Sequence, residues 1–121
     1  MSIENLQQRI RDFAIERDWE QFHSPRSLVL AMQSELGELA ELVQWVKDSE
    51  VNEQWIEENN SRLAEEISDV FIYILRLADV VKVDIETSVL AKIFVNSEKY
   101  PVHLSKGNAK KYTELQQEEN D

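Results

Sequence analysis

The stretch SRLAEEISDVFIYILRLADVVK, which runs from Ser61 to Lys82, decides the fold of this chain. Ser61 can cap a helix, and neither glycine nor proline interrupts the residues that follow it. Apolar side chains recur every three or four positions and cover well over half of the helix circumference, which predicts the most buried helix of the molecule. These side chains are Leu63, Ile67, Val70, Phe71, Ile74, Leu75, Leu77 and Ala78.

The composition of the whole chain also favours helices. Two glycines and two prolines make roughly 3% of the 121 residues, where an average soluble chain has about 12%. Sheets need turns, and turns are rich in these two residues. Hydrophobic residues make up 42% of the chain, which is enough for one core. We therefore expect an all-α fold with few breaks.

Three further amphipathic segments are predicted to be helices. Each begins after a side chain that can cap a helix, and the second has proline at its first position. The three helices are expected over residues 3–17, 25–47 and 85–100, after the caps Ser2, Ser24 and Asp84, and Pro101 ends the last of them.

The remaining segments are expected to be connections. Residues 48–60 are acidic and weakly patterned, so we interpret them as a connector with room for one short helix. The whole chain, residues 1–121, is predicted to be one four-helix, bundle-like domain that assembles as an oligomer. Its core covers about residues 2–100, and residues 101–121 form a polar tail whose end is disordered.

The charge of the chain excludes one large class of partners. The 24 acidic residues outnumber the 13 lysines and arginines, which gives a formal charge of −11 and argues against binding a nucleic acid polymer. The absence of cysteine excludes disulfides and thiolate nucleophiles, and fits a reducing compartment. Because the sequence has no signal peptide and no long apolar stretch, we expect a cytoplasmic chain without membrane contact.

Four carboxylates have the spacing of a metal site. Glu35 and Glu38 lie three residues apart on the second predicted helix, and Glu66 and Asp69 do so on the third. If these helices pair in an antiparallel hairpin, the four side chains meet in one cluster of oxygens. The second pair stands in apolar surroundings, where an ionised carboxylate must be paired or metal-bound. Carboxylate ligands favour Mg²⁺, with Mn²⁺ or Ca²⁺ as substitutes.

Less specific interpretations of these acids stay open. In a chain with 24 acidic residues some pairs fall at this spacing by chance and solvate a surface. Glu41 and Glu65 are possible accessory ligands, but each also fits a solvated charge. Gly37 costs a helix about 1 kcal/mol relative to alanine, so either a ligand or another helix is expected to approach closely there.

Two further groups suggest a nucleotide. Aromatic residues and one histidine can form a slot for a nucleobase, or else belong to the core: Trp19, Phe22, His23 and Trp45. Tyr73 lies seven residues after Glu66, and therefore shares its helix face. A polar ridge on the fourth helix can receive phosphate oxygens or a base edge, or else is ordinary surface: Lys92, Asn96 and Lys99.

Several stretches resemble one known family in the identity of their residues as well as in their spacing. They are RDWEQFHSPR (17–26), ELGELAELVQW (35–45), EEISDVFIY (65–73), the pair Lys92 and Asn96, YPVHLSKG (100–107) and the pair Lys111 and Tyr112. Together they look like the MazG-like nucleoside triphosphate pyrophosphohydrolases, most closely the dCTP pyrophosphatase branch.

The resemblance implies a function and a site. Members of the family are all-α dimers of dimers that split a (deoxy)nucleoside triphosphate between the α and β phosphates, and so remove unwanted nucleotides. Here the substrate would be dCTP-like, with Mg²⁺ held by Glu35, Glu38, Glu66 and Asp69. Lys92 and Asn96 would contact phosphate, sugar or base. Trp19, Trp45 and His23 would lie near the base.

The chain departs from the family pattern at two places. Close relatives often have histidine where this chain has Ile10 in the first helix, which bears on the identity of the base. Relatives are rich in arginine where this chain has residues 97–99, Ser-Glu-Lys. Phosphate binding therefore shifts to other cations, namely Lys99, Lys106, Lys110 and Lys111.

The expected mechanism is metal-assisted hydrolysis, in which two or more Mg²⁺ ions orient a water and lower its pKa. Glu38, Glu66 and Asp69 are the predicted catalytic residues, with Glu38 chosen as the base. A carboxylate-bridged di-iron bundle would need two Glu-x-x-His pairs, and this sequence holds one such spacing, from Glu20 to His23. The alternative that remains is a non-catalytic, acidic helical module that senses a nucleotide or serves as an adaptor.

Overall fold

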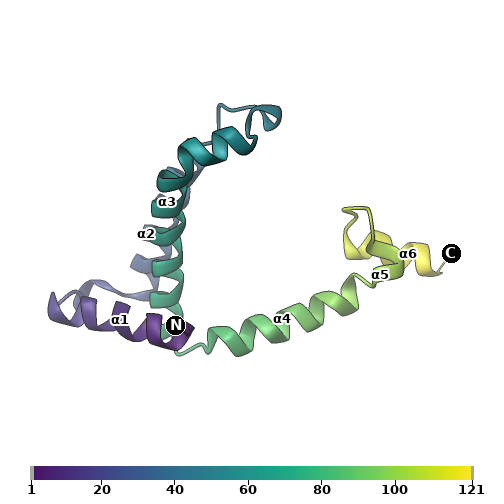
Figure 1. Cartoon of the computed structure of the whole chain (residues 1–121). Helices are drawn as coiled ribbons and strands as arrows, with labels where there is room; N and C mark the ends of the chain where they lie inside the picture. The colour runs from purple at the N-terminus through teal and green to yellow at the C-terminus, as the bar shows by residue number, and fades with distance from the viewer. Residues whose placement is uncertain (1, 121) are drawn as a thin grey trace. The chain divides into compact units, whose positions relative to one another are not determined.

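The computed structural model describes residues 2–120, and within them every regular element is a helix (Figure 1). The all-α prediction is confirmed. In chain order the elements are α1 (Ile3–Glu16), the 3₁₀ turn η1 (Glu20–Phe22), α2 (Pro25–Glu41), the 3₁₀ turn η2 (Asp48–Glu50), α3 (Glu53–Val80), α4 (Ile85–Lys99), α5 (Val102–Ser105) and α6 (Tyr112–Asn120).

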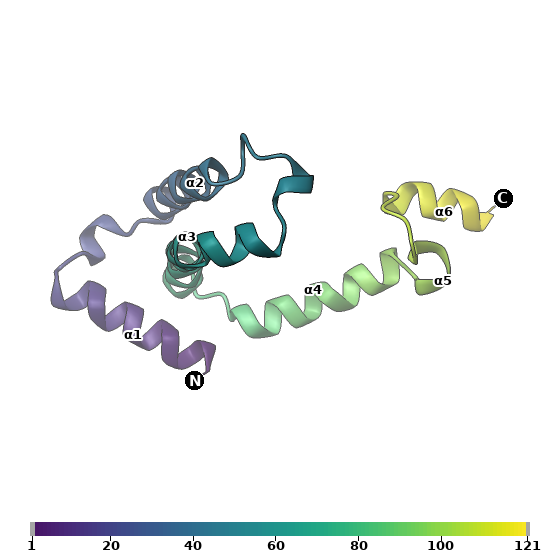
Figure 2. The same ribbon diagram turned by 45° about the horizontal axis from the view of Figure 1, so that its top comes forward.

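The chain forms two compact units, residues 1–83 and residues 84–121. In the first unit α3 packs against both α1 and α2, and α2 and α3 run side by side (Figure 2). The core of this unit gathers around Ala14, Leu28, Leu75 and Ala78, and Leu42, directly after the C-terminal end of α2, is buried as well. Of the four predicted bundle helices, three therefore pack in the first unit, with α3 at its centre as expected, and the fourth begins the second unit.

Three helices begin where capping predicts. The side-chain oxygens of Ser2, Ser24 and Asp84 accept hydrogen bonds from the backbone N–H three residues on, at 3.1 Å each. Pro25 occupies the first turn of α2, where it has no N–H to leave unpaired. Side-chain oxygens at these positions satisfy N–H groups that the helix cannot pair, which fixes the three starts.

The connection between α2 and α3 is shorter than predicted. The second helix was expected to reach residue 47, but α2 ends at Glu41, because the amides of Leu42 and Val43 bond to carbonyls only three residues back and tighten the turn. The third helix was expected to begin after Ser61, but α3 begins at Glu53. The side chain of Asn52 caps it by accepting from the amide of Trp55 at 3.0 Å.

Both α1 and α3 end in a Schellman motif formed without glycine. Asp18 (φ 54°) and Lys82 (φ 61°) adopt the left-handed conformation just beyond the two helices. The next amide then bonds back to the helix, from Trp19 to the carbonyl of Ala14 and from Val83 to that of Ala78. At the end of α1 this reversal turns Trp19 back toward its own helix.

The middle of α3 is less buried than its apolar pattern predicts. Ile67 is 54% and Phe71 42% exposed, whereas Leu75 is 1% exposed. An apolar groove between α1 and α3, which Phe71 lines together with Leu6 and Phe13, stays open in the described chain.

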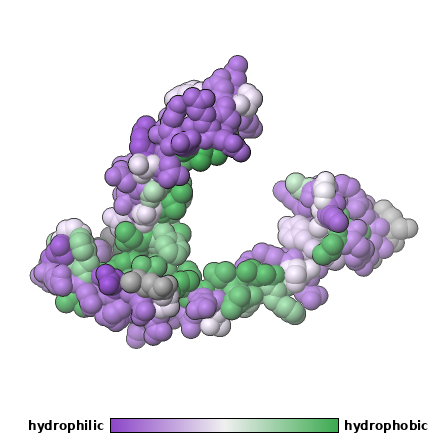
Figure 3. Space-filling view, viewed as in Figure 1, coloured by the Kyte–Doolittle hydropathy of each residue, from purple (hydrophilic) through white to green (hydrophobic). Residues whose placement is uncertain are grey.

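The second unit contains α4, α5 and α6. Apolar side chains on α4 are exposed, including Leu90 (62%), Ile93 (58%) and Phe94 (65%), and they colour much of this helix in Figure 3. Where we expected a polar tail, residues 112–120 form α6 and Leu115 is buried; residue 121 lies outside the described residues. No helix within residues 2–120 has the length and apolar character needed to cross a membrane.

Candidate active site

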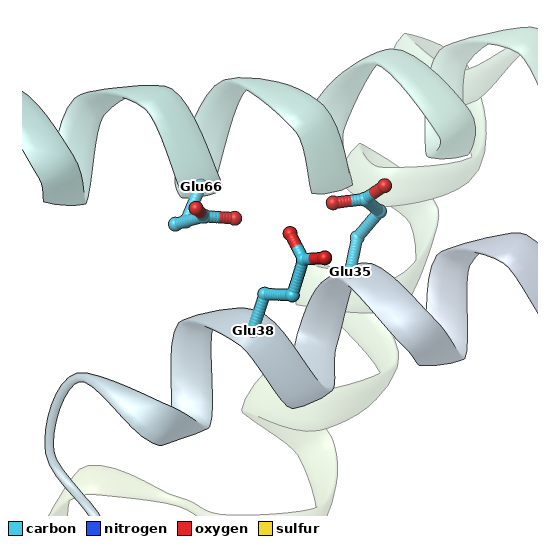
Figure 4. A group of neighbouring side chains, drawn as sticks. All are labelled: Glu35, Glu38 and Glu66. Atoms are coloured by element: carbon cyan, nitrogen blue, oxygen red, sulfur yellow. The ribbon is translucent and has the colours of Figure 1, made fainter.

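Three of the four predicted metal ligands converge between α2 and α3. Glu35 and Glu38 project from one face of α2, and Glu66 projects toward them from α3 (Figure 4). One carboxylate oxygen from each lies within 4.8 Å of the others. The spacing of three residues places the first two on the same face, and the pairing of α2 with α3 supplies the third. We call these three residues the carboxylate trio.

The trio contains oxygens that nothing in the protein satisfies. Glu35 and Glu66 are half-buried, and the Oε2 atom of each is buried without a hydrogen-bond partner among the described residues. A buried acceptor left unpaired costs about 1–3 kcal/mol, and more when it is charged. The two oxygens therefore need a donor or a cation that the chain itself does not provide.

The trio is also electrostatically strained. Burial is the largest cause that raises the pKa of Glu35, followed by the negative charges of Glu38 and Asp69. Burial and then Glu38 raise the pKa of Glu66 in the same way. A divalent cation among the three carboxylates would reverse both effects, because it supplies opposite charge and ligation together. The donor set consists of oxygen alone, and so fits Mg²⁺ or Mn²⁺.

Asp69, the fourth predicted ligand, does not join the trio. Its side chain is exposed and lines an open hollow on the surface of α3 together with Glu65 and Ser68. Its charge is still close enough to raise the pKa of both Glu35 and Glu66. Glu65 likewise raises the pKa of Glu66, whereas Glu41 lies exposed at the end of α2.

Gly37 lies in an open place. No described atom comes within 4 Å of the position that a Cβ atom would take there. The interpretation that another helix packs tightly against this glycine is therefore wrong for the described chain. Approach of a ligand at Gly37 stays a prediction.

The structure brings together part of the predicted aromatic slot. A small cavity between α1 and α3 is lined by Trp19, His23 and Tyr73, with Ile10 and Phe13 on the side of α1. Trp19 meets the ring of Phe13 edge to face, with the ring centroids 5.6 Å apart. Phe22 and Trp45 are not among the lining residues, and Trp45 is 87% exposed in the turn after α2.

A polar network beside this cavity was missed by the sequence analysis. Arg76 is only 6% exposed, and its Nε atom donates to Nδ1 of His23 at 3.0 Å while Nη1 donates to Asp79 at 3.1 Å. Arg11 on α1 grips the same carboxylate with two hydrogen bonds of 2.6 and 2.8 Å. The sequence does contain one sign of this network: Arg76 is the single basic residue in the apolar run from residue 70 to 81, and Asp79 follows it three positions later.

The network lowers the pKa of both His23 and Asp79. Burial, and then the positive charge of Arg76, lower the pKa of His23. The hydrogen bond from Arg11 is the largest cause that lowers the pKa of Asp79. His23 is thereby kept neutral and Asp79 ionised near pH 7.

The predicted phosphate contacts lie in the second unit. Lys92 and Asn96 are exposed and four residues apart on α4. Lys99, at the end of the helix, places its Nζ atom 4.9 Å from the centroid of the Tyr112 ring. Lys106 is exposed, and Lys110 pairs with Glu118. Contact of these residues with a phosphate stays a prediction.

Comparison with known proteins gives one consistent result. The model of the MazG-like family matches residues 30–115. The dCTP pyrophosphatase 1 of Rattus norvegicus is 49% identical over 115 residues, which cover 94% of this chain and 68% of that protein; the Homo sapiens dCTP pyrophosphatase 1 is 47% identical with the same coverage. A crystal structure of a pyrophosphatase from Archaeoglobus fulgidus matches with a TM-score of 0.76 and 35% identity, over 81% of this chain and 91% of that one.

Proposed function

This chain belongs to the MazG-like family, and from that premise we propose that it is a nucleotide pyrophosphatase acting on deoxynucleoside triphosphates. The observation that carries the proposal is the carboxylate trio, whose two unpartnered buried oxygens call for a cation. Solvated surface acids would not leave such oxygens, so the site is better explained by ligation than by chance spacing.

The finer proposal concerns the bond and the base. The enzyme cleaves between the α and β phosphates and releases a nucleoside monophosphate and pyrophosphate. It prefers a dCTP-like substrate and removes unwanted nucleotides. The names of the relatives, dCTP pyrophosphatase 1, support this preference. The cavity beside Trp19 and Tyr73 offers the aromatic wall on which a base stacks.

The residues of the site divide the chemistry between them. Glu35 and Glu66 each present a buried oxygen and would hold Mg²⁺ together with Glu38, with Asp69 as a further ligand. The bound cation would neutralise the triphosphate and acidify a water. Glu38 is the most exposed of the trio, and we assign it the role of the general base that accepts a proton from that water. Attack of the water oxygen on phosphorus then breaks the α–β anhydride bond, and the pyrophosphate leaves with the bonding electrons.

Contacts with the rest of the nucleotide are assigned to residues outside the trio. His23, Trp19 and Tyr73 would meet the base, and Lys92, Asn96, Lys99 and Lys106 would meet phosphate or sugar. Trp45 lies apart from the cavity within this chain, so we give it no direct contact from the same subunit. A homo-oligomer, as a dimer of dimers, would cover the apolar side chains that α4 exposes.

One assay tests the proposal. The purified chain is incubated with each common dNTP and NTP, in Mg²⁺ or in EDTA, and the products are separated. We expect monophosphate and pyrophosphate in Mg²⁺ alone, in greatest yield from dCTP. Diphosphate and phosphate as products would contradict the bond assignment. No turnover of any nucleotide by the folded protein would favour the non-catalytic module.

Two variants make the assay specific for the site. Glu38→Gln and Glu66→Gln should abolish turnover, because each removes one charged ligand of the trio. Glu57→Gln changes an exposed glutamate on α3 that lies outside the site, and serves as the matched control with unchanged activity.

A further inference from the structure

Arg76 is the most buried charged side chain within residues 2–120, and it lines the small cavity between α1 and α3 together with His23 and Tyr73. It lies on α3 between Leu75 and Asp79, which both accept hydrogen bonds from α1. A buried guanidinium at this place is costly unless its N–H groups are hydrogen-bonded. Its Nη1 and the two donors of Arg11 converge on Asp79, which leaves Nε to bond His23. The planar guanidinium is therefore held at two points, by Asp79 and by the imidazole.

This hydrogen bond determines which nitrogen of His23 carries the proton. A guanidinium only donates, so the Nδ1 atom that it meets at 3.0 Å must present a lone pair. In a neutral imidazole the single proton then lies on Nε2. Besides Arg76, Glu20 is the charged group that acts on this ring; Arg76 opposes protonation of His23 and Glu20 favours it more weakly.

The second ring nitrogen is available to a ligand. His23 lines the cavity with Trp19 and Tyr73, and its Nε2 atom makes no hydrogen bond within the described residues. Its remaining N–H is therefore free to meet what the cavity takes in.

We infer that Arg76 is a positioning residue of the nucleotide site: it holds His23 as the neutral Nε2–H tautomer, so that the imidazole offers a fixed donor to an acceptor atom of the base. The acceptor is a carbonyl oxygen or an unprotonated ring nitrogen, since an N–H group there would leave two donors facing each other. The identity of the ligand rests on the proposed function, whereas the tautomer does not.

The tautomer is tested in the ligand-free, full-length chain by ¹⁵N–¹H correlation NMR of the imidazole rings. The chain has two histidines, so His103→Gln leaves His23 as the single signal. We expect the Nδ1 resonance of an unprotonated nitrogen, which persists as the pH falls below 6.5, the ordinary pKa of histidine. A protonated Nδ1 at pH 7 would overturn the inference. This spectrum needs no change at Arg76, so it is decisive even if variants there fold poorly.

The effect on the ligand is tested by a double-mutant cycle with dCMP, a probe that turnover does not consume. Arg76→Met should weaken dCMP binding about three- to tenfold, the value of one hydrogen bond, and bring protonation of His23 closer to pH 6.5. In the His23→Gln background, Arg76→Met should have little further effect on binding, because an amide neither titrates nor changes tautomer.

The outcomes separate the possible failures. An equal loss from Arg76→Met in both backgrounds would mean that the arginine only supports packing, and would overturn its positioning role. Failure of the wild-type chain to bind dCMP would contradict the claim that His23 donates a hydrogen bond to the base. Failure of the turnover assay alone would contradict the pyrophosphatase proposal and leave both measurements standing.

Discussion

At the scale of single residues, two groups of charges behave in opposite ways. In the carboxylate trio burial, and then the crowding of like charges, raise the pKa of Glu35 and Glu66. Around Asp79 two arginines meet one carboxylate and lower its pKa. The first arrangement costs the folded state free energy until a ligand arrives, whereas the second stabilises it. Sites that require a ligand are expected to show this kind of strain.

The strain in the trio has a measurable pH dependence. A folded-state pKa raised above the ordinary 4.5 means that the folded protein binds protons more tightly, so metal-free stability falls as the pH rises above 4.5. Glu66→Gln should therefore raise the melting temperature of the metal-free protein, by more at pH 7 than at pH 5. Mg²⁺ should stabilise the wild type and not the variant. Scanning calorimetry in EDTA and in Mg²⁺ measures both, and a destabilised variant in EDTA would argue against the strain.

Asp79 should show the reverse dependence. Its lowered pKa gives stability that is fully present above the ordinary 3.8 and is lost as the pH falls below it. Asp79→Asn should cost about 2 kcal/mol at pH 7 and progressively less toward pH 3, measured by urea unfolding. Asp12→Asn, an exposed change on α1, should cost less than about 0.5 kcal/mol at either pH. A cost that does not change with pH would argue against the ion pairs.

The residue scale also shows what a single sequence reveals about a site. Carboxylates three apart on paired helices were enough to predict that three of the side chains converge, because helix periodicity fixes which side chains share a face. The same periodicity could not decide that Asp69 stays outside the trio, since that depends on the stagger between α2 and α3. The partnership of Arg76 with His23 spans 53 residues, and no local pattern records such a distance.

At the scale of elements, the predicted helix starts are right where a single capping side chain precedes the apolar pattern. Ser2, Ser24 with Pro25, and Asp84 leave one way to begin each helix. The third helix was expected to begin after Ser61, but no glycine or proline separates Ser61 from the preceding residues, and the helix extends back to its cap, Asn52. The side chain of Asn52 accepts from the amide of Trp55 and so caps α3, and the predicted start after Ser61 was too late.

The corrected boundary leads to a prediction. Asn52→Ala should cost about 1 kcal/mol, since it leaves the amide of Trp55 without its cap. Ser61→Ala lies inside α3, where alanine is the better helix former, so it should be neutral or slightly stabilising. Chemical denaturation of both variants distinguishes the two starts. If Ser61→Ala destabilised the protein more than Asn52→Ala, the helix would instead begin after Ser61.

At the scale of the whole molecule, the charge and the apolar surface both indicate further partners. A chain of net charge −11 repels a triphosphate, so the nucleotide is expected to bind together with its cation. Several large apolar side chains are exposed together on α4, and an exposed group of this kind often marks an interaction surface. The family resemblance that the sequence motifs predicted is confirmed, and the dimer of dimers that it implies stays a prediction.

The apolar face of α4 should control the assembly. Leu90→Glu or Phe94→Glu places a charge on this face, and should shift the chain to a smaller species in light scattering coupled to size-exclusion chromatography. Ser88→Glu introduces the same charge at an exposed polar position of α4, and should leave the oligomer intact. An unchanged mass in both apolar variants would show that α4 does not lie in the interface.

Gly37 has a consequence for the engineering of this protein. Its surroundings would accept a methyl group without a clash, and alanine in a helix is about 1 kcal/mol better than glycine. A library selected for heat resistance alone would therefore enrich Gly37→Ala. If the open space beside the two acids of α2 belongs to the incoming nucleotide, the winners of that selection would be the poorest catalysts.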